Sequence, residues 1–228
     1  MLHENMRHEY KYLINAFDEA VLTQRLTKVV NKDNNCKKSD RYKIRSLYFD
    51  NADCKAVAEK LCGVSNREKF RIRYYEDDLS FIRLEKKVKV NNLCKKYMAE
   101  ISLDECKKIL NGEYDFLKEK SSALLLEFYS KILNEQLRPS IIVNYVRKPF
   151  VYAPGNVRIT IDSKISTSIS WCNFLDKNSL TLPVLQNGIS VLEVKYDNFI
   201  PFIVKDLIQT NHSQITAFSK YVMCKMAV

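Results

Sequence analysis

The sequence predicts an α+β protein built as a closed, mainly antiparallel β-barrel of about eight strands with surrounding helices. Three observations lead to this fold class. About eight segments alternate charged and apolar residues as strands do, short connections favour antiparallel pairing, and amphipathic helical segments flank the strands. The chain has 228 residues, of which 46% are hydrophobic, and can bury a substantial core, so we expect residues 1–228 to form one domain.

The elements follow one another without a repeat or a linker. Strands are predicted at 7–14, 43–50, 68–75, 79–90, 94–102, 140–152, 156–166 and 189–197. Helices are predicted at 16–30, 50–63, 103–110, 121–136, 201–209 and 213–226, and residues 31–40 read as a loop. Asn15 can cap the first helix, Ser102 and Glu105 can form a capping box for the third, and Pro201 suits a first helical position.

Charged side chains occupy one face of strand after strand, because neighbouring residues of a strand point to opposite faces. The charged faces hold Arg7, Glu9 and Lys11; Lys69, Arg71 and Arg73; Arg83, Glu85, Lys87 and Lys89; Arg147; Arg158, Thr160, Asp162 and Lys164; and Glu193, Lys195 and Asp197. An ordinary solvated sheet surface would explain any one of these strands. Their recurrence favours a closed barrel whose charged faces line the interior. That interior must hold water and ions, because unpaired buried charges cost several kcal/mol each.

The composition favours an anionic partner. The 37 Lys and Arg residues exceed the 27 Asp and Glu residues and give a formal net charge of +10. No apolar run approaches the length of a membrane span and no apolar signal core is visible, so we expect a cytoplasmic protein with reduced thiols. The four glycines form neither glycine-rich phosphate-binding motif, so side chains must supply any phosphate contacts.

Short motifs along the chain occur in an order that resembles a known family. They are RHEYKY, SLYFDN, the R-x-R of Arg71 and Arg73, LEKK, the R-x-T-x-D of Arg158 to Asp162, LEVK and FSKY. Together, from about residue 6 to residue 222, they resemble the VTC-type polyphosphate polymerase domain of the triphosphate tunnel metalloenzyme (CYTH-like) superfamily. The resemblance implies that the barrel interior is a triphosphate tunnel.

The resemblance also implies roles for the matching positions. The residues it implies for catalysis are Lys11, Arg71, Arg73, Lys87, Arg158 and Lys195, and those for substrate binding are Arg7, Lys95, Arg147, Ser219 and Lys220. Glu193, together with Glu9, would bind Mn²⁺ or Mg²⁺. Arg7 stands where the wider superfamily has the first Glu of an E-x-E-x-K signature, and Tyr97 replaces the second member of the K-x-R pair that Lys95 opens. Asp162 would either bind metal or orient a cation.

The implied activity is transfer of the γ-phosphate of ATP to a growing inorganic polyphosphate chain. Phosphoryl transfer fits the charged faces, because it depends on positioning and charge neutralisation more than on a protein nucleophile. Two alternatives remain open: hydrolysis of inorganic or nucleoside triphosphate in the same tunnel, and non-catalytic polyphosphate binding. Nucleic acid is disfavoured, since the tyrosines alternate with core-like residues and do not form an exposed stacking surface. Coupling to export would require a membrane-protein partner, and no oligomeric state is predicted.

Overall fold

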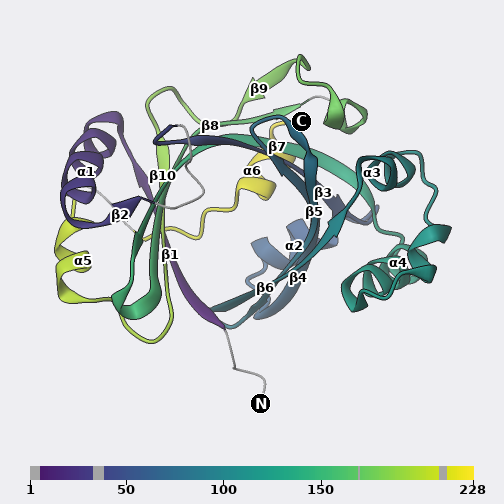
Figure 1. Cartoon of the computed structure of the whole chain (residues 1–228), viewed down its shortest axis with the longest axis horizontal. Coiled ribbons are helices and arrows are strands. Elements are labelled where there is room, and N and C mark those ends of the chain that lie inside the picture. The colour runs from purple at the N-terminus through teal and green to yellow at the C-terminus, as the bar shows by residue number, and fades with distance from the viewer. Residues whose placement is uncertain (1–5, 33–38, 169, 211–214) are drawn as a thin grey trace.

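A closed barrel organises the chain. The computed structural model describes residues 6–32, 39–168, 170–210 and 215–228, and within these ranges ten strands form one antiparallel sheet. The sheet order is β2-β7-β3-β4-β5-β6-β1-β10-β8-β9, and an additional β7–β8 pairing closes it. The predicted eight-stranded barrel is therefore confirmed, with β2 and β9 attached outside the ring (Figure 1).

The strands are β1 (Arg7–Ile14), β2 (Asn31–Lys32), β3 (Tyr42–Asp50), β4 (Asn66–Tyr75), β5 (Asp78–Val90), β6 (Leu93–Ile101), β7 (Arg138–Tyr152), β8 (Val157–Ser168), β9 (Thr181–Pro183) and β10 (Ser190–Tyr196). The helices are α1 (Ala16–Val29), α2 (Lys55–Leu61), α3 (Leu103–Leu110), α4 (Ala123–Glu135), α5 (Phe202–Leu207) and α6 (Lys220–Met226). Short 3₁₀ turns lie at Asp115–Glu119, Pro154–Asn156 and Trp171–Leu175. Each strand predicted from the sequence is present, with small shifts at its ends.

Local sequence signals set several helix boundaries as predicted. The side chain of Asn15 accepts a hydrogen bond from the Asp18 amide at the start of α1, and Ser102 and Glu105 form the capping box of α3. Pro201 differs slightly from the prediction, because it is the N-cap of α5 and not its first helical residue.

The predicted helix over 213–226 is wrong in its N-terminal part. Residues 211–214 lie outside the described residues, and α6 begins only at Lys220. Before it, Ile215 forms an isolated bridge with Tyr12, and the Thr216 amide donates to the Lys11 carbonyl at 2.8 Å. The backbone therefore pairs with β1 at this point, which a helix would not allow. The predicted loop at 31–40 contains β2, and its residues 33–38 are outside the described residues.

The apolar faces of the strands point outward and pack against the helices. Ile72 and Leu84 are fully buried beneath Phe128 of α4, while Ile159 lies in a second cluster with Leu22 of α1. Figure 1 shows α3 and α4 on one side of the barrel and α1 and α5 on the other. Burying each such side chain contributes about 1.5–3 kcal/mol. The charged faces are consequently left to line the interior.

A third apolar cluster lies inside the barrel and anchors α6. Tyr221 and Val222 of α6 pack there with Tyr48, Val143 and other inward-facing side chains. The helix lies within the opening of the ring in Figure 1. This packing brings the N-terminus of α6 to the charged interior. Among the described residues, no helix is both long and apolar enough to cross a membrane.

Candidate active site

A cavity of about 440 Å³ occupies the barrel interior. Along β4 it is lined by Arg67, Lys69, Arg71, Arg73 and Tyr75, a span of about 27 Å at about 3.4 Å per residue. Every residue predicted for the site lines this cavity: Arg7, Glu9, Lys11, Arg71, Arg73, Lys87, Lys95, Arg147, Arg158, Glu193, Lys195, Ser219 and Lys220. In total the lining contains fifteen Lys and Arg side chains and two Glu side chains. The interior is therefore strongly cationic.

Glu85 holds three of these cations in place. Its buried carboxylate lies 2.6 Å from Arg71 Nη2, 3.5 Å from Arg73 Nη1 and 3.1 Å from Lys96 Nζ. Burial raises the pKa of Glu85, but the charges of Arg71 and Arg73 outweigh it and keep this pKa well below its usual value. Arg71 Nη1 also donates to Tyr48 Oη at 2.7 Å. The two guanidinium groups are thus fixed before any ligand arrives.

Asp162 holds a second set of cations. Arg147 donates two parallel hydrogen bonds to it at 2.7 Å each, and Lys220 Nζ lies 2.6 Å from its Oδ2 atom. Burial raises the pKa of Asp162, yet Arg147 and Lys220 outweigh this effect and lower it. Both carboxylate oxygens are engaged by cations, so in this structure Asp162 orients cations.

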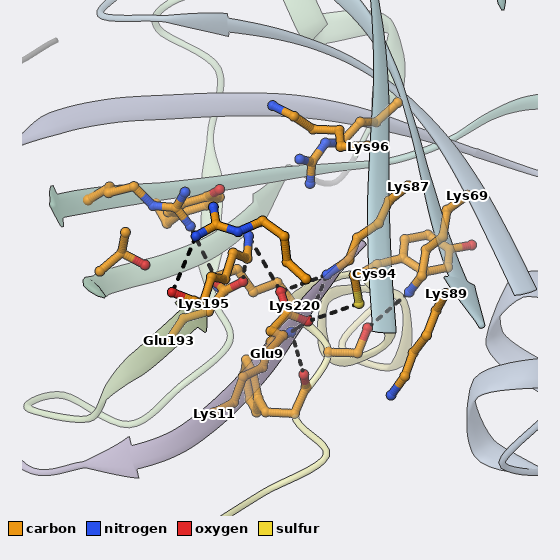
Figure 2. A pocket seen from close by; sticks show the side chains of 18 of the residues that line it. Glu9, Lys11, Lys69, Lys87, Lys89, Cys94, Lys96, Glu193, Lys195 and Lys220 are labelled. Atoms are coloured by element: carbon orange, nitrogen blue, oxygen red, sulfur yellow. Dashed lines mark hydrogen bonds and ion pairs between the residues drawn. The ribbon is translucent and has the colours of Figure 1, made fainter. Parts of the chain in front are cut away.

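Glu9 and Glu193 are diagonal neighbours on the β1–β10 pair, where Glu9 is opposite Lys195 and Lys11 is opposite Glu193. Lys195 Nζ lies between them, 3.4 Å from Glu9 and 3.0 Å from Glu193 (Figure 2). Lys87 Nζ lies 2.7 Å from Glu9. Burial raises the pKa of Glu9, but Lys11 and Lys87 outweigh it and lower this pKa from 4.5 to about 2. Both carboxylates are therefore ionised at neutral pH.

The paired carboxylates fit a divalent ion that is completed by substrate. Mg²⁺ in proteins commonly takes one or two carboxylates together with substrate phosphates, and Glu9 and Glu193 supply such a pair. Among the described residues, no group of three or more His, Cys, Asp or Glu side chains could hold an ion on protein ligands alone. Lys195 Nζ pairs with both carboxylates, so a metal held by Glu9 and Glu193 would have to displace this ammonium and take its other ligands from a phosphate.

Three other predicted residues line the cavity and contact neighbouring side chains. Arg158 is opposite Lys195 on β8 and donates to Tyr42 Oη at 3.2 Å. Arg7 Nε donates to Asp197 at 2.8 Å. Lys95 lines the cavity, and its ammonium lies 5.3 Å from the centre of the Tyr97 ring.

Ser219 connects α6 to the strands. Its hydroxyl caps α6 by accepting a hydrogen bond from the Val222 amide, and it lies 3.3 Å from Lys69 Nζ. The next residue, Lys220, reaches Asp162. Two adjacent residues at one helix start thus contact two different strands.

Five members of the predicted charged faces do not line the cavity: Glu85 and Asp162 are buried behind the cations that they hold, Asp197 pairs with Arg7, and Arg83 and Lys164 lie elsewhere. The Arg83 guanidinium lies 3.9 Å from the Phe81 ring centre and pairs with Glu100. Lys164 is exposed, with a positive φ of 52°, where the β7–β8 register shifts. The bulge at this shift disrupts the alternation on which the prediction relied.

Sequence reasoning did not assign several residues of the cavity to the site. They are Lys60, Arg67, Lys69, Lys89, Lys96, Tyr42, Tyr48, Tyr75 and Tyr145. Strand alternation had placed Lys69 and Lys89 on the charged faces expected to line the interior, without a role in the site, and the same alternation could have indicated Arg67. Lys60 comes from α2, and no local pattern connects it to the barrel.

The comparisons with known proteins agree with this geometry. The family model described as the VTC domain matches residues 6–228, so the chain belongs to the VTC domain family. No curated protein matches it in sequence.

Three solved structures have a similar fold at low identity. The triphosphatase of the Mimivirus capping enzyme is 13% identical, with a TM-score of 0.40 and 91% of each chain covered. A candidate adenylate cyclase from Bacillus halodurans is 14% identical, with a TM-score of 0.47 and 83% of this chain and 80% of that chain covered. A Pyrococcus furiosus protein is 12% identical, with a TM-score of 0.45 and coverage of 89% and 85%.

Proposed function

We propose that the protein is a metal-dependent polyphosphate polymerase, which transfers the γ-phosphate of ATP to the end of an inorganic polyphosphate chain inside the barrel. Membership of the VTC family and the fifteen-cation lining support phosphate substrates. The proposal treats residues 1–228 as one domain and places it in the cytoplasm, where ATP is available. A membrane-protein partner for export belongs to the same proposal.

The state of the carboxylates is the observation that favours polymerisation over hydrolysis. Four carboxylates of the interior are each ion-paired: Glu9, Glu85, Asp162 and Glu193. Burial raises the pKa of each, but the neighbouring cations outweigh burial and lower it. Such groups are weak general bases for activating water. The terminal oxygen of a polyphosphate chain is already anionic and needs no base. A chain end is therefore the better nucleophile in this cavity.

The chain's own cations would position both reactants. Arg71 and Arg73, fixed by Glu85, would hold oxygens of the ATP triphosphate, and Arg147, fixed by Asp162, would bind beside them, because Arg73 and Arg147 flank the Tyr145 ring. Arginine suits this task because it offers bidentate contacts to phosphate. An acceptor oxygen then forms a bond to the γ-phosphorus while the bond to the β,γ-bridging oxygen breaks, and ADP leaves.

Lysines and the carboxylate pair would complete the site. Lys11, Lys87 and Lys195 surround Glu9 and would neutralise charge on the transferring group. Arg158, Lys95, Arg7, Ser219 and Lys220 would hold the rest of the substrate along the lining. When bound at Glu9 and Glu193, Mn²⁺ or Mg²⁺ would supply charge neutralisation to the phosphate oxygens.

One observation supports hydrolysis of triphosphates as a second candidate. Burial, followed by the charges of Lys11 and Lys87, lowers the pKa of Lys69 to about 7. A lysine with that pKa can accept a proton from water near neutral pH. Hydrolysis would then depend on Lys69, whereas polymerisation would not need its basic form.

An assay of products separates the candidates. Purified protein is incubated with ATP and Mn²⁺, and ADP, phosphate and long chains are each quantified. A polymerase yields ADP in step with long chains, whereas a hydrolase yields free phosphate and loses activity in Lys69→Met. Binding of long chains without turnover of ATP would leave a non-catalytic polyphosphate-binding protein and refute the proposal.

A further inference from the structure

The SLYFDN motif at residues 46–51 carries a buried acid, Asp50, which ends β3, is 2% exposed and does not line the cavity. Its Oδ1 atom accepts hydrogen bonds from the Asn51 amide at 2.9 Å and from the Ala56 amide of α2 at 3.0 Å. Its Oδ2 atom accepts a hydrogen bond from the hydroxyl of Tyr221 in α6. One carboxylate thus joins β3, the first turn of α2 and the distant helix α6.

Tyr221 is fixed at its ring as well as at its hydroxyl. The side chain is 1% exposed, and its ring stacks on that of Tyr48 with the centres 5.0 Å apart and the planes inclined by 29°. Burial raises the pKa of Tyr221, and the hydrogen bond to Asp50 raises it further, so the phenol keeps its proton and donates it to the carboxylate. The Tyr221 side chain is therefore restrained in both position and direction.

Contacts with the barrel set the orientation of α6, because the helix has only seven residues and isolated helices shorter than about 12 residues are marginal in water. Before the helix, the Thr216 amide donates to the Lys11 carbonyl of β1 at 2.8 Å. Within the helix, Tyr221 is bound to Asp50. Ser219 and Lys220, which line the cavity, lie between these two attachments.

The direction of Lys220 follows from that of Tyr221, since successive residues of a helix are turned by about 100°. With Tyr221 fixed, Lys220 points into the cavity, where its Nζ atom lies 2.6 Å from Asp162 (Figure 2). The stacked Tyr48 accepts a hydrogen bond from Arg71 Nη1 at 2.7 Å. The contacts of Asp50 and Tyr221 thus lead to cations on two sides of the cavity.

We propose that Asp50 is a positioning residue of the phosphate site, which fixes the rotation of α6 through Tyr221 and so directs Lys220 toward bound phosphate. The inference rests on the proposed function, in which Lys220 holds substrate. Asp50 itself touches no phosphate. A contact that served folding alone would change the free energy of unfolding and leave the phosphate affinity of the folded protein unchanged, so the two roles are separable.

Phosphate binding by a variant that lacks one hydroxyl tests the inference without requiring turnover. Tyr221→Phe removes the hydrogen bond to Asp50 and keeps the ring. We expect it to bind tripolyphosphate about five- to tenfold more weakly by calorimetry, at a temperature at which circular dichroism shows it folded. Tyr129→Phe is the matched control, because the Tyr129 hydroxyl donates to Asp115 at 3.1 Å outside the cavity, and its dissociation constant should change less than about twofold.

A double-mutant cycle shows whether the effect passes through Lys220. In a Lys220→Ala background no ammonium remains to be directed, so adding Tyr221→Phe should weaken binding by less than about twofold. Asp50→Asn replaces the acceptor in place of the donor and should show the same dependence on Lys220. This second variant also keeps the inference testable if Tyr221→Phe does not fold.

Three outcomes would overturn the inference. Unchanged affinity together with a lower melting temperature would make Asp50 an anchor for folding only. A loss of equal factor with and without Lys220 would show that Tyr221 acts elsewhere, and an equal loss in Tyr129→Phe would show an effect without specificity.

The same variants separate this inference from the proposed function. If the loss depends on Lys220 in a protein that does not turn over ATP, the positioning role stands and the polymerase proposal falls. If Tyr221→Phe binds tripolyphosphate and makes long chains as the parent does, the positioning role falls and the polymerase proposal stands.

Discussion

Replacing Glu85 with Gln tests whether the cations of the barrel are held by buried carboxylates. The Glu85 side chain is 1% exposed and contacts Arg71, Arg73 and Lys96, so Glu85→Gln leaves three cations without their shared counter-charge. Removing one partner from a buried ion pair costs about 3–5 kcal/mol. For a chain of this size each kcal/mol lowers the melting temperature by about 2–4 °C. We therefore expect the variant to melt about 6 to 20 °C below the parent.

Ligand distinguishes this electrostatic cost from simple damage to packing. Tripolyphosphate can replace the missing negative charge, so the gap in melting temperature between Glu85→Gln and the parent should narrow when it is added at saturation. Glu100→Gln is the control, because it removes an exposed ion pair. The Glu100 side chain is 73% exposed, its carboxylate lies 3.9 Å from the Arg83 guanidinium, and such exposed pairs contribute at most about 1 kcal/mol.

The assay is thermal unfolding followed by circular dichroism, with and without tripolyphosphate. If Glu85→Gln melts within about 2 °C of the parent, its loss is no larger than the loss expected for the Glu100→Gln control. That result would refute the idea that Glu85 restrains the cations. A large loss that tripolyphosphate does not reduce would instead assign Glu85 a packing role.

Three further predictions concern the same interior. Tripolyphosphate at a hundredfold excess over its dissociation constant should stabilise the parent by about 2.7 kcal/mol, and monophosphate at matched ionic strength should stabilise it far less. The Lys11→Ala/Arg73→Ala variant should show a smaller rise in melting temperature with tripolyphosphate. Equal shifts for all phosphates would place these charges in solvent. Glu193→Gln should abolish metal-dependent turnover with an unchanged circular dichroism spectrum, and normal turnover would exclude Glu193 from the site. Lys69 has a pKa of about 7 in the folded chain, below its ordinary value of 10.5. Between these two pH values the unfolded chain binds more protons than the folded chain, so the free energy of unfolding should rise with pH over this range. Lys69→Met should lose that part of the rise in urea titrations, and an identical pH profile would contradict the depressed pKa.

The sequence by itself determined the strands and the side chains that share a face. Alternation is a local property of the extended backbone, so Arg71 and Arg73, or Glu193 and Lys195, fall on one side whatever the strand pairs with. Helix caps are equally local, and the side chains of Asn15 and Ser102 act as predicted. The charged faces could therefore be assigned to the interior once the chain was expected to close.

The tertiary structure alone decided how those faces meet. The pairing of Lys11 with Glu193 and of Arg71 with Glu85 depends on strand register, which long-range packing sets. Lys60 enters the cavity only because α2 packs beside β4, and the helix does not reach back to Ile215 and Thr216 because they pair with β1. These contacts join segments far apart in the chain, and no local pattern of residues encodes them.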